Sequence, residues 1–222
     1  MRSLQYLALI AIAFAISAIP VVHWPFSWLE TYFHEISHGL MAIFSGGKIV
    51  KIELNYDGSG VCYTMGGVRA FVSFSGYAGA VLWGALIYIA ASASKKHTYI
   101  VAVIILTMVA SSAVLWGRDL TTLIIMAIMA VVLFLAIKHA EQGLIHWFLQ
   151  FVGIYILINA ARSPLHLLDG QSKGDGSTLA QITLLPEMVW IIIWELLALW
   201  TLWVLWKKTK KPKVQDIEFE QS

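Results

Sequence analysis

Residues 24–44 read WPFSWLETYFHEISHGLMAIF, and this stretch decides both the fold class and the chemistry expected of the chain. Its length and apolar character are those of a segment that crosses or enters a lipid bilayer, which takes about 20 residues. It nevertheless contains His34, Glu35 and His38. Ionisable side chains are costly in hydrocarbon, and at such a depth they are by default functional. The stretch therefore predicts a chemical site within a membrane-embedded helix.

The composition of the whole chain is typical of a membrane protein. Of its 222 residues, 59% are hydrophobic and 13% are charged, and the mean hydropathy is +0.76, which is too apolar for a soluble domain of this length. The formal net charge of +2 is too small for a surface that binds nucleic acid. The single cysteine, Cys62, excludes an internal disulfide and a cysteine-based zinc ribbon. Any bound metal therefore needs histidine and carboxylate ligands.

Seven apolar stretches approach the length of a transmembrane helix. They cover residues 4–22, 25–44, 70–93, 98–116, 120–137, 144–161 and 188–206. We expect the first to be a retained span rather than a signal peptide, because no clear small-residue cleavage site precedes His23. If residues 25–44 are re-entrant, the count falls to six. The prediction is an all-α polytopic membrane protein with six or seven transmembrane helices, in which residues 1–206 form one integral membrane domain and residues 207–222 a charged, solvated tail.

Lysines gather in three places that predict the orientation of the chain. They are Lys95 and Lys96, Lys138, and the group Lys207, Lys208, Lys210, Lys211 and Lys213. With seven spans these clusters fall on one side of the membrane, and cytoplasmic segments collect Lys and Arg. The sequence therefore predicts a multi-pass protein of the cell membrane with a cytoplasmic C-terminus. Other basic residues do not follow this pattern, among them Arg2, Lys48, Lys51, Arg69 and Arg118.

Residues 49–64 alternate in polarity on both sides of the Gly-rich stretch Asp57-Gly58-Ser59-Gly60, which predicts a β-hairpin after the histidine-bearing segment. An exposed strand edge could hold another polypeptide in extended form by adding it to the sheet. The alternative is a hairpin that only caps the helical bundle.

The pattern His-Glu-x-x-His at residues 34–38 predicts a zinc site. Residues i and i+4 share one face of a helix, so His34 and His38 can bind one metal ion while Glu35 lies beside it as a candidate general base. A catalytic zinc takes three protein ligands and keeps a fourth position for water. Asp169 and Asp175, in the stretch before the last span, are the candidates for the third ligand. Each also has a structural interpretation, Asp169 as a turn former and Asp175 as a helix N-cap.

These motifs resemble those of the intramembrane zinc metalloproteases of the site-2 protease type. The residues that carry the resemblance are His-Glu-Ile-Ser-His-Gly-Leu at 34–40, Gly-Gly at 46–47 and Leu-Asp-Gly at 168–170. The resemblance implies that His34, His38 and Asp169 bind zinc and that Glu35 activates water.

A compact bacterial branch of site-2-protease-like membrane proteins is similar over more of the chain. Its Gly-Tyr-x-Gly turn matches Gly76-Tyr77-Ala78-Gly79, and its late Ser-Asp-Ala-like motif matches Gly174-Asp175-Gly176. This second resemblance favours Asp175 as the third ligand. Both aspartates stay open at this point.

The resemblance implies hydrolysis of a peptide bond in a membrane protein or peptide substrate, by zinc-activated water with Glu35 as base and within the lipid bilayer. Two other functions are compatible with the same residues. One is a zinc-binding membrane regulator or scaffold without proteolytic activity, and the other is a small transporter whose intramembrane His, Glu and Asp form an ion path. The intact Glu35 favours the enzyme, because a purely structural zinc site needs no base.

Overall fold

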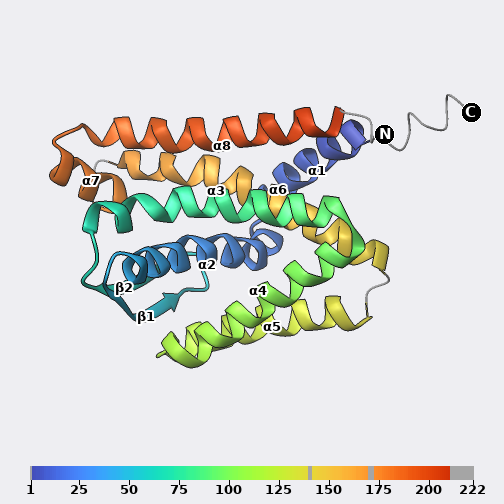
Figure 1. Ribbon diagram of the computed structural model, residues 1–222, viewed down its shortest axis with the longest axis horizontal. Helices are drawn as coiled ribbons and strands as arrows, with labels where there is room; N and C mark the ends of the chain where they lie inside the picture. The colour runs from blue at the N-terminus through green and yellow to red at the C-terminus, as the bar shows by residue number, and fades with distance from the viewer. Residues whose placement is uncertain (1, 140–141, 170–172, 211–222) are drawn as a thin grey trace, which may run out of the picture.

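The computed structural model describes residues 2–139, 142–169 and 173–210, and it shows a helical bundle with one small hairpin (Figure 1). The elements in chain order are α1 (Arg2–Ser17), α2 (Pro20–Phe44), β1 (Lys48–Leu54), β2 (Gly60–Met65), α3 (Arg69–Ala93), α4 (Lys95–Trp116), α5 (Leu120–His139), α6 (Gln142–Arg162), the 3₁₀ helix η1 (Ser163–Asp169), α7 (Asp175–Thr183) and α8 (Glu187–Lys210). The predicted helical membrane fold with a hairpin after the His-Glu-x-x-His helix is confirmed.

Five helices in the described residues are long and apolar enough to cross a membrane: α3, α4, α5, α6 together with η1, and α8. A sixth span is possible if α1 and α2 are taken together as one broken segment, whose two parts are bent by 108°. The structure thus agrees with the predicted count of six spans, and within its described residues it does not show seven separate spans. The reason is local: α1 has only 16 residues, and the polar side chains of the metal motif lower the hydropathy of α2.

The two ends of the bundle differ in character. Figure 1 shows that α3 ends, α4 begins, α5 ends and α8 ends at one end, which therefore carries the three lysine clusters. The hairpin, α7 and the start of α3 lie at the opposite end. Helix α8 continues through Lys210, four residues beyond the predicted span, so part of the predicted tail is helical. Lysines are favoured in the last turn of a helix by its dipole. Residues 211–222 lie outside the described residues.

The hairpin pairs β1 with β2 in antiparallel fashion, from Lys48 opposite Met65 to Leu54 opposite Gly60. The register shifts between Ile49 and Lys51, which is the signature of a β-bulge. Because the bulge moves the inward face by one residue, Ile49 is buried together with Ile52 and Leu54 instead of pointing away from them. The bulge thereby lets one short strand present a continuous apolar face to the helices.

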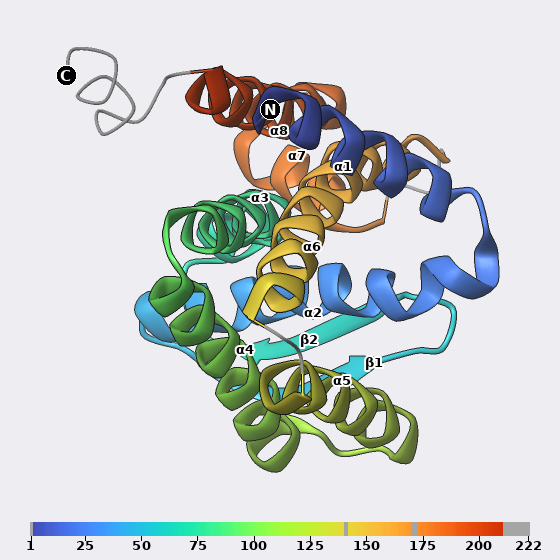
Figure 2. The ribbon, with the colours of Figure 1, turned by 90° about the vertical axis from the view of Figure 1, so that its right-hand side faces the viewer.

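Helix α2 lies between the hairpin and the other helices of the bundle. Figure 2 shows the hairpin on one side of α2 and α3 with α6 on the other. Tyr32 and Phe33, just before the metal motif, are fully buried, and the Tyr32 hydroxyl lies 2.9 Å from Oγ of Ser112 on α4. Covered on both sides, the polar motif of α2 is held within protein instead of facing lipid.

Candidate metal centre

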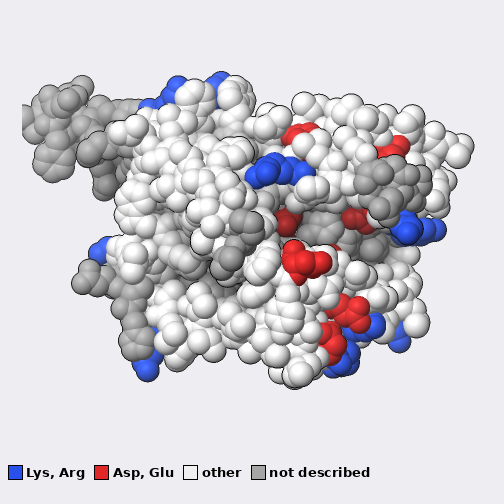
Figure 3. All heavy atoms as spheres, turned by 180° about the vertical axis from the view of Figure 1, so that it is seen from behind, with Lys and Arg blue, Asp and Glu red and all other residues white. Residues whose placement is uncertain are grey.

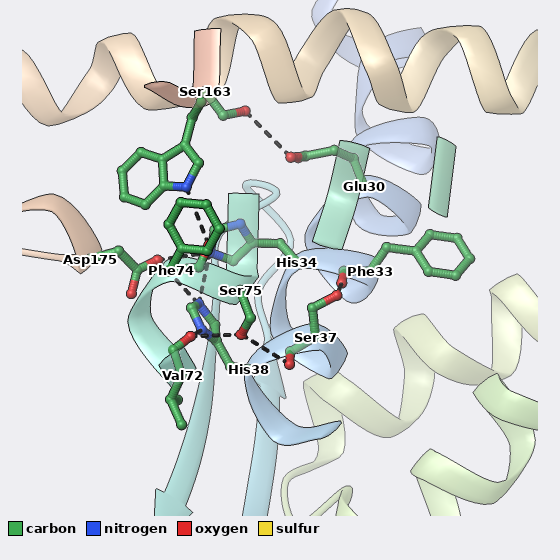
Figure 4. Close-up of polar contacts among 11 residues, drawn as sticks. Glu30, Phe33, His34, Ser37, His38, Val72, Phe74, Ser75, Ser163 and Asp175 are labelled. Carbon is green, nitrogen blue, oxygen red and sulfur yellow. Dashed lines mark hydrogen bonds and ion pairs between the residues drawn. The ribbon is translucent and has the colours of Figure 1, made fainter. Parts of the chain in front are cut away.

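The candidate metal centre is formed by three side chains from two helices that are far apart in the sequence. His34 and His38 lie one turn apart on α2, and Asp175 is the first residue of α7. The Nε2 atoms of the two histidines are 3.0 Å apart. Oδ2 of Asp175 lies 3.3 Å from Nε2 of His34 and 3.1 Å from Nε2 of His38 (Figure 4). We call His34, His38 and Asp175 the metal trio.

The orientation of the His38 ring directs the lone pair of Nε2 into the trio. Nδ1 of His38 lies 2.7 Å from the carbonyl oxygen of Val72 on α3. A carbonyl can only accept a hydrogen bond, so in the neutral imidazole Nδ1 carries the proton and Nε2 has the free lone pair. A backbone carbonyl behind the ring is a usual partner of metal-binding histidines, where it sets the tautomer and the ring orientation.

The trio fits a zinc ion by its chemistry and by its spacing. Electron-pair acceptors this close repel one another unless a cation lies between them. In a tetrahedral site with ligand distances of about 2.0–2.2 Å, neighbouring ligand atoms are about 3.3 Å apart. The separations of 3.0, 3.1 and 3.3 Å in the trio are close to that value. Two nitrogens and one carboxylate oxygen also leave the fourth position that a catalytic zinc keeps for water.

Asp169, the other aspartate predicted as a third ligand, ends η1. Its side chain lies outside the described residues. The choice between the two aspartates stays a prediction, and the distances from Asp175 to both histidines support Asp175.

Helix α3 passes close to both imidazoles because residue 76 is a glycine. A Cβ atom there would lie 2.6 Å from Nε2 of His34 and would also collide with the ring of His38. Gly79 leaves the same kind of clearance for the side chain of Ser37. Both glycines lie inside α3, in agreement with the predicted span over residues 70–93, so the stretch that resembles the Gly-Tyr-x-Gly turn is helical in this chain. Their role is close helix contact, which small residues allow in membrane bundles.

Aromatic side chains form one wall of the metal centre. The Tyr77 ring packs edge-on against His34, with 4.5 Å between ring centroids, and lies 4.6 Å from the ring of Trp194 on α8. Nε1 of the fully buried Trp194 donates a hydrogen bond of 3.2 Å to the carbonyl oxygen of Phe74. This packing restricts the His34 ring on the side away from the hairpin.

Comparison with known families gives a match to the description "Peptidase M50B-like" over residues 7–205. The chain belongs to the peptidase M50B-like family. This agrees with the resemblance to site-2 proteases, and the family is one of peptidases that typically depend on a metal. Comparisons with curated proteins and with solved structures gave no match. The matched range contains α2, the hairpin and α7, which are the elements that form the site.

Glu35 of this M50B-like protein lines a cavity of about 420 Å³ together with the metal trio. Its side chain is only 6% exposed. Gly60, the first residue of β2, lies against it, and a Cβ atom there would come within 3.1 Å of Cγ of Glu35. The start of β2 forms one wall of this cavity, and the start of α3 forms another.

Two groups near the centre of the M50B-like protein have shifted pKa values. Burial raises the pKa of the Asp175 carboxyl, but the charge of His38 and the hydrogen bonds from both histidines outweigh it, so that the pKa is lowered. Asp175 is therefore a carboxylate, the form that binds a metal. Burial, with a contribution from Glu35, raises the pKa of the Cys62 thiol to about 12. Cys62 is thus uncharged at neutral pH, as expected for a packing residue next to Gly39.

Several residues of the site were not singled out by the sequence. Arg69 and Ser73 line the cavity from α3, and Val72 supplies the carbonyl for His38. No motif identifies them. Arg69 is a cation at the start of an apolar span, and this position is the only feature of the sequence that could have indicated its place in the site. In the sequence it stands only as a basic residue that does not fit the predicted orientation.

A second polar cavity, of about 310 Å³, lies beside the preceding turn of α2. Glu30 lines it together with Arg162 and His166, and Oε1 of Glu30 accepts a 3.5 Å hydrogen bond from Ser163. Figure 3 shows acidic atoms deep in a hollow of the molecular surface with a basic side chain at its border. Polar cavities therefore lie next to two successive turns of α2, although the helices that surround α2 are apolar.

Proposed function

We propose that the chain is an intramembrane zinc metalloprotease that hydrolyses a peptide bond of a membrane protein substrate. The observation that carries the proposal is the convergence of His34, His38 and Asp175 beside Glu35, in a chain that belongs to a peptidase family. A binding module or scaffold has no need of a glutamate next to the ligands in an open cavity.

The residues of the site have distinct roles in this reaction. His34, His38 and Asp175 hold the zinc ion, with Val72 and Gly76 fixing the position of the rings. Zinc in such a site lowers the pKa of bound water to about 7 and polarises the scissile carbonyl group. Glu35 accepts the proton of the attacking water and delivers it to the leaving amine nitrogen.

The strand β2 is suited to hold the substrate in extended form. The outer edge of β1 is already covered, because Ile52 forms a bridge with Gly117 and the backbone N–H of Leu54 donates to Oγ1 of Thr122 at 2.8 Å. The β2 side of the sheet instead lines the cavity that contains Glu35. A helix shields its own peptide bonds, so a protease must unwind the segment that it cleaves, and strand addition at β2 stabilises the unwound form.

The distribution of lysines supports a cytoplasmic C-terminus also with fewer than seven spans. The five candidate spans alternate in direction from α3 to α8, so the three lysine clusters meet at one end. In this orientation the metal centre lies toward the opposite, outer side of the membrane.

The test compares Glu35→Gln with the wild type in purified full-length protein. Zinc content is measured by elemental analysis, and cleavage is followed by mass spectrometry on single-span membrane peptides with helix-breaking residues. We expect Glu35→Gln to retain zinc and to reduce cleavage by about 10²–10⁴-fold, the usual contribution of a general base. Glu53→Gln, which changes a glutamate of β1 that pairs with Lys51, is the matched control and should cleave normally.

Other outcomes separate the remaining functions. Cleavage by Glu35→Gln at the wild-type rate with zinc bound would rule out the proposed role of the base. Stoichiometric zinc without cleavage of any peptide by the wild type would favour a regulator or scaffold. Ion flux into vesicles containing a zinc-free wild type would favour the transporter.

A further inference from the structure

A further cavity lies at the lysine-rich end of the bundle, away from the metal centre. It has a volume of about 470 Å³ and is formed where helices end or begin, by α1, α3, α4, α6 and α8. Among the described residues that line it, the charged or ionisable ones are Lys95, His146, Lys208 and Tyr88, and none carries a carboxyl group. We call it the lysine cavity. Its position at the ends of apolar spans is where lipid headgroups meet a membrane protein.

The lysines of this end differ in where their ammonium groups lie. On α8, Nζ of Lys207 lies 3.8 Å from the ring centroid of Trp203, and Nζ of Lys210 lies 3.6 Å from that of Trp206. Lys208, between them, instead lines the lysine cavity. The cavity therefore has a cation on each side, Lys208 from α8 and Lys95 from the first turn of α4.

A continuous chain of hydrogen bonds fixes the inner part of the lysine cavity. Nε2 of Gln5 donates to Oε1 of Gln150 at 2.7 Å, and Nε2 of Gln150 donates to Nε2 of His146 at 2.9 Å. Nδ1 of His146 then donates to Oγ1 of Thr98 at 3.1 Å, and the Thr98 hydroxyl donates to the carbonyl oxygen of Ser94 at 3.0 Å. In this polar chain every donor has an acceptor. Within the described residues neither Lys95 nor Lys208 forms an ion pair, so both can interact with something that enters the cavity.

We propose that the lysine cavity binds the phosphate group of an anionic phospholipid. Two ammonium groups and the positive end of the α4 dipole favour a phosphate, and no carboxylate among the described lining residues competes with it. The apolar side of the cavity supports a lipid over free phosphate. Ile89 lines it, and Leu86 and Leu82 continue the same exposed face of α3 toward the middle of the span, where an acyl chain can lie.

The experiment measures lipid retention by native mass spectrometry of the full-length protein in detergent, with phosphatidylglycerol as the probe and phosphatidylcholine as the neutral comparison. We expect the wild type to retain phosphatidylglycerol selectively. Each lysine near an anionic headgroup contributes about fivefold in affinity, so the double variant Lys95→Gln/Lys208→Gln should bind about 25-fold more weakly. The double variant Lys95→Arg/Lys208→Arg keeps both charges and should retain the lipid.

Lys96→Gln/Lys207→Gln is the matched control, because it removes two charges from adjacent positions that do not line the cavity. The control should bind phosphatidylglycerol like the wild type. An equal loss in both double glutamine variants would overturn the proposal in favour of general surface attraction. Binding of inorganic phosphate that depends on Lys95 and Lys208, without selective phosphatidylglycerol retention, would overturn the lipid assignment. Zinc content and peptide cleavage are independent readouts of the proposed protease function, and we expect both to be unchanged.

Discussion

Two clusters of histidine and hydrogen-bonding side chains lie within the apolar helices of this protein, and they differ in how their atoms are paired. In the polar chain beside the lysine cavity, each donor meets an acceptor and the series ends on a backbone carbonyl. In the metal trio, two imidazole nitrogens and a carboxylate oxygen converge within 3.3 Å, and all three are electron-pair acceptors in their metal-binding form.

The difference separates a structural cluster from a functional one. Buried polar groups in a stable protein are paired, so a completed chain needs nothing further. Converging acceptors are stable only with a proton or a cation between them. An intramembrane histidine is therefore not evidence of a metal by itself: His146 belongs to the first kind of cluster, and His34 and His38 belong to the second.

The largest effect is expected from removing the charge of the trio. Asp175→Asn replaces a carboxylate ligand, so we expect loss of zinc and a fall in cleavage by about 10³-fold or more, since metal stabilisation of the transition state amounts to several kcal/mol. Zinc content and cleavage are measured together. Asp169→Asn is the comparison, and it should retain zinc. Loss of zinc in Asp169→Asn alone would assign the third ligand to Asp169.

A smaller effect on zinc binding is expected from a substitution that displaces the imidazole rings of His34 and His38 without replacing a ligand. Gly76→Ala places a methyl group against both imidazoles, so zinc affinity should fall by about 10–100-fold, as it does when groups that orient ligands are altered. Gly143→Ala is the control, because a Cβ atom there meets nothing within 4 Å. Zinc affinity is measured by competition with a chelator. Wild-type affinity in Gly76→Ala would show that α3 can move away at no cost.

A substitution in the polar chain should lower the stability of the protein and should leave metal binding unchanged. Gln150→Leu leaves partners on both sides unpaired, so the free energy of unfolding should fall by about 1–2 kcal/mol. Thermal unfolding in detergent measures this loss, and zinc content reports on the trio. A loss of zinc from the folded variant would contradict the separation between the two clusters.

The smallest effect is expected from the aromatic wall. Tyr77→Phe keeps the ring that packs against His34 and removes only the hydroxyl. Zinc affinity should therefore change by less than about twofold, which corresponds to less than about 0.4 kcal/mol. Tyr77→Ala removes the ring and should weaken zinc binding measurably. Equal weakening in both variants would indicate that the hydroxyl, not the ring, positions His34.

Much of the fold was accessible from the sequence, because apolar length and alternation are local properties. The helices over residues 70–93 and 120–137 and the hairpin after the metal motif follow directly from them. The sequence left the span count open between six and seven, because the pattern of α1 and α2 does not reveal the sharp bend between them. The bulge in β1 was likewise hidden, since it depends on which strand residues the helices bury.

The sequence by itself determined the membrane-embedded helical class, the pair His34 and His38 on one helix face, and Glu35 beside them, since helical periodicity sets these relations within one segment. Only the tertiary structure decided that Asp175 lies next to the two imidazoles, that α3 approaches them at Gly76, and that Lys95 and Lys208 line one cavity. The physical reason is distance along the chain. A sequence motif consists of residues that lie within a few turns of one helix, whereas contacts between separate helices depend on how their surfaces pack.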